Sequence, residues 1–187
     1  MRLSDMISIA MDYLVVAAAV ALVIPLLYMV GYRMIYQGLC KGKKPLSWKN
    51  VVWAMLFLCY IVVLCGATLM GRTNLFQERE IRGFFTSYRE AWTYFQTNSW
   101  RNLFINILLF IPMGFLLPLG IRKLRVAWKT CLTGFGISLA IELVQLFACI
   151  GVFECDDLLN NTLGTLIGYG VFVICGQICG KIRLTPL

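Results

Sequence analysis

The sequence predicts an all-α integral membrane protein, a bundle of about five transmembrane helices. Of the 187 residues, 60% are apolar and only 14% are charged, whereas a soluble domain carries about 25% charged residues. The mean hydropathy of +0.79 agrees with this class. The apolar residues also fall into stretches long enough to cross a hydrocarbon core of about 30 Å as helices.

Five stretches are predicted to span the membrane. The first is too long for the apolar core of a signal peptide, so we expect it to be retained. The third is shorter and contains Pro112 and Pro118, which a membrane helix tolerates when neighbouring helices satisfy the freed carbonyl groups. No long linker interrupts the chain, so a single domain over 1–187 is expected. The predicted spans are 13–32, 51–70, 103–119, 130–150 and 158–180.

Lysine and arginine predict the orientation, because short cytoplasmic loops are enriched in them. The segments 33–49, 121–129 and 181–183 contain lysines and arginines but no acidic residue. We therefore predict that the N-terminus lies outside and the C-terminus lies in the cytoplasm. This asymmetry also accounts for most of the net charge of +8, so nucleic acid is not an expected partner.

The composition excludes several classes of function. The chain has no histidine, which excludes a Ser-His-Asp triad and a histidine-ligated zinc ion. No glycine-rich phosphate loop occurs, and no cofactor or metal is expected. Most of the eight cysteines lie inside spans and are expected to pack there as small apolar residues. A disulfide between Cys149 and Cys155 is the alternative.

An amphipathic interfacial helix is predicted in the outer loop between the second and third spans. Aromatic residues recur there at helical spacing beside charged residues, as in helices that lie in the headgroup region. This helix is an interfacial anchor, a lid on the bundle, or a wall of an outer site whose arginines meet an anionic headgroup. The aromatic residues are Phe84, Phe85, Tyr88, Trp92 and Phe95, and the arginines are Arg79, Arg82, Arg89 and Arg101.

Polar residues in the outer halves of three spans are the strongest functional indication, because a charge at the bilayer centre costs about 2.5–3.5 kcal/mol. Glu142 is predicted roughly 12 Å below the outer end of its span. Gln145 shares its helix face, and Arg101 is a candidate partner of the carboxylate. We expect these side chains to converge in a ligand-binding pocket. The predicted binding residues are Arg101, Asn106, Glu142, Gln145, Asp156, Asp157 and Asn161.

A structural interpretation of the same residues remains open. The amides Asn106, Gln145 and Asn161 would then hydrogen-bond across helices, at about 0.6–2 kcal/mol each. Asp156 and Asp157 would cap the N-terminus of the fifth span.

Small residues in the spans predict close helix packing. Glycines four residues apart form ridges that let helices approach, within the chain or in a homodimer. These glycines are Gly164 with Gly168 and Gly176 with Gly180, and Gly134 and Gly136 are further candidates.

Three motifs occur in order along the second half of the chain. They are RNLFINILLFIPMGFLLP at 101–118, ELVQ at 142–145 and FECDDLLNNTLGTLIGY at 153–169. Together they resemble the VanZ-like family. Many members have an arginine where this chain has Gly151. If that arginine pairs with an acidic residue in relatives, Arg101 or a loop arginine is expected to replace it here.

The resemblance implies a multi-pass protein of the cytoplasmic membrane of a Gram-positive bacterium. It also implies low-level resistance to teicoplanin and related lipoglycopeptides, with little effect on vancomycin. The implied partners are a membrane lipid, a lipid-linked cell-wall precursor or the antibiotic itself.

The expected function is therefore to bind or shield a ligand of the outer leaflet. The alternative is an intramembrane enzyme that modifies a lipid headgroup, with Glu142 as general base and Asp156 or Asp157 holding a divalent metal. A third alternative is transport with Glu142 as the proton or cation carrier, which the lack of an evident repeat makes weak.

Overall fold

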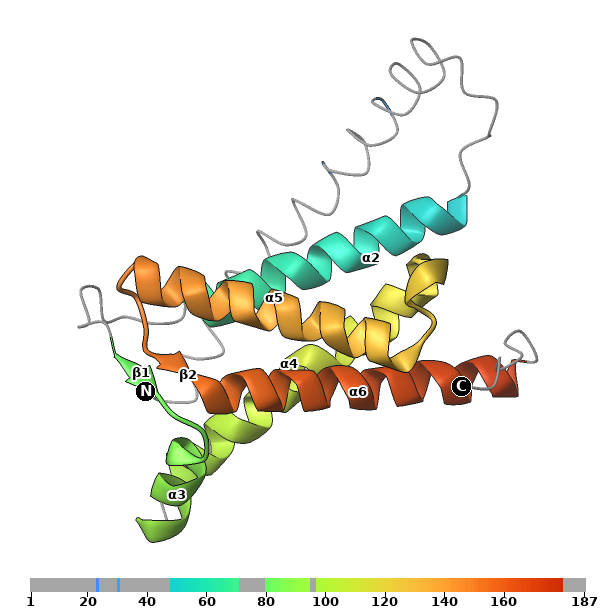
Figure 1. The fold of residues 1–187 in the computed structure, drawn as a ribbon. Coiled ribbons are helices and arrows are strands. Elements are labelled where there is room, and N and C mark those ends of the chain that lie inside the picture. The colour runs from blue at the N-terminus through green and yellow to red at the C-terminus, as the bar shows by residue number, and fades with distance from the viewer. Residues whose placement is uncertain (1–22, 24–29, 31–47, 71–79, 95–96, 180–187) are drawn as a thin grey trace. The chain divides into compact units, whose positions relative to one another are not determined.

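The structure is a computed structural model whose described residues are helical apart from loops and one pair of two-residue strands. Four helices among these residues are long and apolar enough to cross a membrane, which confirms the predicted all-α membrane class. The predicted first span, 13–32, lies outside the described residues except for two positions. The described residues are Val23, Val30, 48–70, 80–94 and 97–179 (Figure 1).

The first of two compact units, Met1–Gly71, contains one described long helix. This helix, α2 (Trp48–Cys65), continues into a π-helical turn, η2 (Gly66–Met70). In that turn the Thr68 hydroxyl donates a hydrogen bond of 2.8 Å to the Leu64 carbonyl. The predicted second span is therefore confirmed as a helix.

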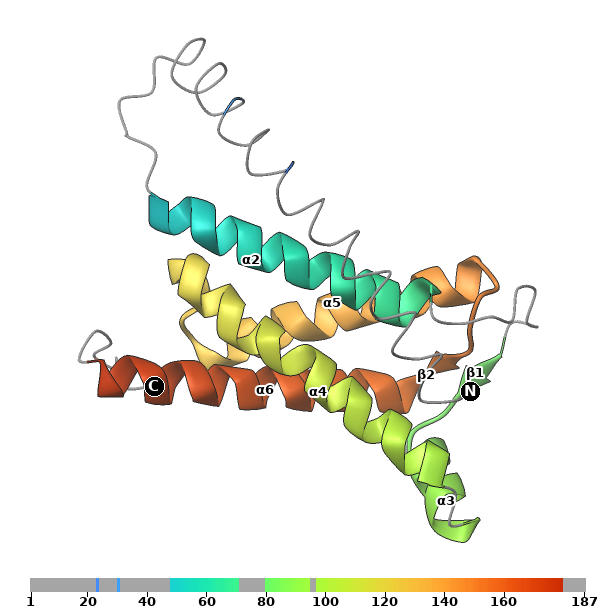
Figure 2. The ribbon, with the colours of Figure 1, turned by 180° about the vertical axis from the view of Figure 1, so that it is seen from behind.

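The second unit, Arg72–Leu187, is built on three long helices. They are α4 (Thr97–Gly120), α5 (Ala127–Phe147) and α6 (Cys155–Ile178). α6 packs against both α4 and α5 and is the central helix of the unit (Figures 1 and 2). Each of the three corresponds to a predicted span.

The helix ends differ from the predicted ones by a few residues, for local reasons. α5 ends at Phe147 because Cys149 adopts a left-handed conformation with φ 56°, a common way to end a helix. Glu154 is extended directly before α6, with φ −109° and ψ 115°. α6 therefore begins at Cys155, three residues before the predicted span and within the motif at 153–169.

α4 continues through both of its prolines. Proline lacks an N–H group and therefore removes one intrahelical hydrogen bond. The carbonyl four residues earlier then needs another donor, either from a neighbouring residue or from water. In the last turn of the helix, where carbonyls have no intrahelical donor, the guanidinium Nε of Arg125 donates a 3.1 Å hydrogen bond to the Pro118 carbonyl. The predicted third span is thus a complete helix of 24 residues.

Glycines set the spacing between α4 and α6. A Cβ at Gly164 would overlap the Ile107 carbonyl, and one at Gly168 would overlap the Ile111 carbonyl. From the other side, a Cβ at Gly114 would overlap the backbone of Thr165. The predicted ridge on α6 therefore lets two backbones of one chain touch.

The other predicted small-residue positions differ from one another. Gly134 on α5 faces the Thr165 side chain, whereas a Cβ at Gly136 would meet nothing within 4 Å. Gly176 is buried, and Gly180 lies outside the described residues.

The predicted loop helix is present as α3 (Thr86–Thr93), which packs against α4. It is only eight residues long, so the aromatic residues do not form one helical stripe. Phe84 and Phe85 precede it and are exposed, and Trp92 is 70% exposed. Tyr88 instead contacts α6 through a hydrogen bond to Asn160. Phe95 lies outside the described residues.

A short parallel strand pair, which the sequence does not predict, connects this loop to α6. β1 (Ile81–Arg82) pairs with β2 (Phe153–Glu154). The Phe153 N–H also donates to the Glu80 carbonyl at 3.0 Å. The pair holds the segment before α3 beside the start of α6.

Candidate functional site

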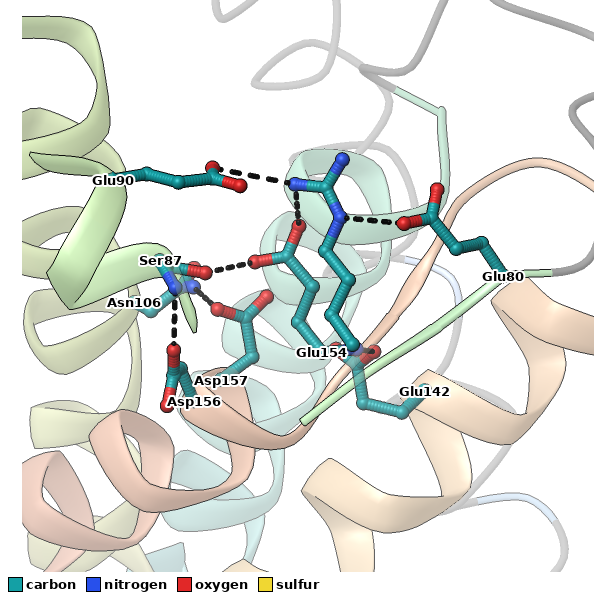
Figure 3. A network of polar contacts seen from close by, with 9 residues as sticks. Glu80, Ser87, Glu90, Asn106, Glu142, Glu154, Asp156 and Asp157 are labelled. Atoms are coloured by element: carbon teal, nitrogen blue, oxygen red, sulfur yellow. Dashed lines mark hydrogen bonds and ion pairs between the residues drawn. The ribbon is translucent and has the colours of Figure 1, made fainter. Parts of the chain in front are cut away.

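Polar side chains gather at one end of the second unit, where α3, the first turns of α4, the end of α5 and the start of α6 meet (Figure 3). We call this region the α3 end. Every acidic residue that the structure describes belongs to it. These residues are Glu80, Glu90, Glu142, Glu154, Asp156 and Asp157.

Asp156 holds the start of α3. Its Oδ1 accepts a hydrogen bond from the Phe85 N–H at 2.5 Å, and its Oδ2 accepts one from the Ser87 N–H at 2.9 Å. The first N–H groups of a helix have no partner within it, and a carboxylate placed there also meets the positive end of the helix dipole. Asp156 is only 1% exposed. It therefore caps α3, and not its own helix α6 as the structural interpretation of the sequence expected.

Phe85 adopts a conformation that suits this contact. Its φ of 62° lies in the left-handed region, where residues with a Cβ are uncommon. The hydrogen bonds to Asp156 help to hold it there. The Ser87 hydroxyl adds a 3.0 Å hydrogen bond to Oε2 of Glu154. The carboxylates of Glu154 and Asp156, two residues apart at the start of α6, thus fix the start of α3.

Asp157 joins α6 to α4. Its Oδ1 accepts a hydrogen bond of 2.5 Å from the Asn106 amide. Asp157 is 6% exposed, and a buried carboxylate needs such donors because it has lost its hydration. The sequence places these residues 51 positions apart, and their predicted approach is found.

Glu142 is buried on α5 at 2% exposure. Its Oε2 accepts a hydrogen bond of 3.1 Å from the Glu154 N–H, which belongs to β2. Gln145, one turn later on α5, is 1% exposed. The carboxylate therefore ties the end of α5 to the strand that leads into α6.

The two asparagines of α6 make different contacts. The Asn161 amide donates to the Ser138 hydroxyl of α5 at 2.8 Å, and Asn160 accepts a hydrogen bond from the Tyr88 hydroxyl. Both side chains are buried, and Asn160 Nδ2 and Asn161 Oδ1 have no partner among the described residues. These atoms retain hydrogen-bonding capacity in a buried place.

Ser138 was missed by sequence reasoning, and Asn160 was noted as polar but not assigned to the site, although a signal existed for both. Ser138 lies four residues before Glu142, so helical spacing alone places both on one face of α5. Asn160 is adjacent to a predicted binding residue. We define the polar cluster as Asn106, Ser138, Glu142, Gln145, Asp156, Asp157, Asn160 and Asn161.

Arg82 of β1 is surrounded by three glutamates. Its nitrogens lie 3.2 Å from Glu80, 3.7 Å from Glu90 and 3.8 Å from Glu154. Partial burial lowers the pKa of Arg82, but the hydrogen bond to Glu80 and the charges of the three glutamates outweigh it and raise the pKa. Arg82 is therefore the loop arginine that stands beside the acidic motif. Its charge is already compensated.

Arg101 does not pair with Glu142. Its side chain is exposed on the first turns of α4, and within the described residues it takes part in no ion pair. Arg89 on α3 is also exposed. Arg79 lies outside the described residues.

Neither a disulfide nor a metal ligand set is found in the described part of the chain. Cys149 and Cys155 are both free thiols, so the alternative of a disulfide between them is wrong. No group of three or more cysteine, aspartate or glutamate side chains is arranged to hold a metal there.

Comparison with known proteins adds a family. The VanZ/LLP1 family model matches residues 20–176. Protein VanZ of Enterococcus faecium is 28% identical to this chain over 76 residues, which are 41% of this chain and 47% of that protein. The chain thus aligns with about half the length of this curated relative. No solved structure matches the chain.

Proposed function

The chain belongs to the VanZ/LLP1 family, and from this premise we propose that it confers low-level resistance to teicoplanin and related lipoglycopeptides. It would act from the cytoplasmic membrane of a Gram-positive bacterium. The four long apolar helices among the described residues support a multi-pass membrane protein. The means we propose is binding or shielding of an outer-leaflet ligand at the α3 end.

One observation carries this proposal, namely that buried polar contacts hold an exposed aromatic segment in place. Asp156 fixes the start of α3. Beside it, Phe84 is 59% exposed and Phe85 is 65% exposed. Exposed aromatic rings at a membrane interface suit contact with acyl chains and headgroups. The polar cluster would thus shape a surface for a ligand with a lipid tail.

Arg89 and Arg101 are the arginines that we assign to the anionic part of such a ligand. Both are exposed, and guanidinium groups bind phosphate and carboxylate in a bidentate manner. Arg82 is less suited, because three glutamates already surround it.

The ligand class follows from these two features together. A lipid-linked cell-wall precursor and a lipid-anchored antibiotic both combine an apolar chain with an anionic group. A drug that relies on its lipid tail would be hindered more than one without a tail. This difference is the expected reason for an effect on teicoplanin that exceeds the effect on vancomycin.

Inhibitory concentrations test this proposal. A susceptible Gram-positive host would express the full chain or carry the empty vector, with membrane expression verified. We expect a several-fold rise for teicoplanin and little change for vancomycin. Equal values for the chain and the empty vector would refute the resistance function, and an equal rise for both drugs would refute the role of the lipid tail.

A further inference from the structure

We propose that the loop between α4 and α5 binds the phosphate of an anionic phospholipid in the leaflet that it faces. This basic loop, residues 121–129, lies at the other end of the second unit from α3. It contains a 3₁₀ turn, η3 (Arg122–Leu124). Its cationic side chains are Arg122, Lys123, Arg125 and Lys129.

The charge of this loop is not compensated within the described part of the second unit. All acidic residues described there lie at the α3 end. Arg122 and Lys123 are exposed, and no described residue forms an ion pair with either. Each such cation near an anionic bilayer surface contributes to binding. The loop is therefore suited to an anionic partner.

Internal contacts fix the shape of the loop before any ligand binds. The Leu124 carbonyl accepts a hydrogen bond from the Thr130 hydroxyl, and the Arg125 carbonyl accepts one of 3.1 Å from the Tyr169 hydroxyl. The Arg125 side chain is held as well, because its Nε donates to the Pro118 carbonyl. A preformed surface loses less conformational entropy when it binds.

An exposed indole favours a lipid over a free anion. Trp128 is 62% exposed, and the Lys129 Nζ lies 5.4 Å from the centre of its ring. Tryptophan is enriched where membranes meet water, because its ring suits the headgroup level. A phospholipid can contact both the cations and the indole, whereas inorganic phosphate can contact only the cations.

Lipid binding to the purified full chain in non-ionic detergent tests this inference. Native mass spectrometry would compare phosphatidylglycerol with phosphatidylcholine of the same acyl chains. We expect preferential retention of phosphatidylglycerol by the wild type. The double variant R122Q/K123Q should bind it roughly 10- to 30-fold more weakly, since two cations are lost. Both side chains are exposed, so the variant should fold.

Two control variants separate the loop from net charge. R122K/K123R keeps both charges and should retain the preference. K49Q removes one exposed cation at the start of α2, outside this loop and the α3 end, and should leave phosphatidylglycerol binding within about twofold, whereas R122Q alone should weaken it several-fold. Equal loss in K49Q and R122Q would overturn the assignment to this loop, as would equal binding of the two lipids by the wild type.

Competition by glycerol phosphate distinguishes a lipid from a free anion. This compound carries the phosphate without acyl chains. We expect that it does not displace phosphatidylglycerol at similar concentration. Equivalent displacement would show that the loop binds phosphate alone and would overturn the assignment to a lipid.

Discussion

The carboxylate of Asp156 on α6 accepts a 2.5 Å hydrogen bond from the backbone N–H of Phe85, 71 residues earlier in the chain. This contact places a left-handed aromatic residue at the start of α3. It connects the acidic motif, which the sequence marks as functional, to the exposed aromatic segment. The acidic motif therefore fixes the start of α3, in addition to the part that we propose for it in ligand binding.

The first prediction concerns this cap. Asp156→Ala removes two hydrogen bonds to a charged acceptor, so we expect the protein to lose about 2 kcal/mol or more of stability. This loss of stability should be concentrated in the loop that contains α3. Hydrogen exchange of residues 81–94 should accelerate more than exchange in the middle of α6.

Glu90→Gln is the control for that variant, because it changes a half-buried carboxylate of α3 that lies 3.7 Å from Arg82. In this variant, hydrogen exchange of residues 81–94 should stay close to the wild-type rates. Unchanged protection of residues 81–94 in Asp156→Ala would contradict the capping role.

The second prediction concerns the contact between α4 and α6. Asn106→Ala leaves the buried Asp157 carboxylate without this donor, so we expect a loss of about 1.5–3 kcal/mol. A double-mutant cycle with Asp157→Ala should give a coupling energy of similar size. Equilibrium unfolding in mild detergent with added denaturant measures both. Additive effects of the two substitutions would contradict a direct interaction.

The third prediction concerns the glycine ridge. Gly168→Ala places a methyl group against the Ile111 carbonyl, so α4 and α6 must separate and we expect a loss of about 1–3 kcal/mol or more. Gly170→Ala is the matched control on α6, where a Cβ meets nothing within 4 Å. Thermal unfolding should show destabilisation in the first variant alone. Equal melting temperatures of Gly168→Ala and Gly170→Ala would contradict the close approach of α4 and α6.

The fourth prediction concerns pH. Burial raises the pKa of Tyr88 above its ordinary value of 10.0, the hydrogen bond with Asn160 lowers it in part, and the charges of Asp156 and Asp157 raise it further. The folded state thus holds the phenolic proton more tightly than the unfolded state. This contribution to stability is complete below pH 10 and is lost as the pH rises through the raised pKa.

Melting temperatures across the alkaline range test this prediction. Tyr88→Phe should be less stable at neutral pH, because the hydrogen bond is lost, and should lose less further stability at alkaline pH. Tyr94→Phe changes an exposed tyrosine and should keep the wild-type slope. The same alkaline slope in Tyr88→Phe and wild type would refute the assignment to Tyr88.

The sequence predicted the helices well because membrane spans have a strong signal, namely long apolar stretches. It also predicted that Asn106 approaches the acidic motif, because polar side chains in spans avoid lipid by facing other helices. The orientation in the membrane remains a prediction from the loop charges.

The partner of Asp156 could not be predicted. An aspartate at the start of a helix ordinarily caps that helix, and only the tertiary fold brings α3 within reach. The strand pair could not be predicted either, because β1 and β2 are neighbours in the structure but lie far apart in the sequence. The choice between Arg82 and Arg101 was open for the same reason, since both flank the spans and only the position of β1 puts Arg82 beside Glu154.

The most direct test of the central claim measures inhibitory concentrations of teicoplanin and vancomycin for variants of the polar cluster. The host would express wild type, Glu142→Gln, Asn106→Ala or the control Glu90→Gln at equal membrane levels. The proposed function predicts that wild type and Glu90→Gln raise the teicoplanin value selectively and that the two cluster variants lose this rise. Full teicoplanin resistance in Glu142→Gln and Asn106→Ala would contradict a functional role of the polar cluster.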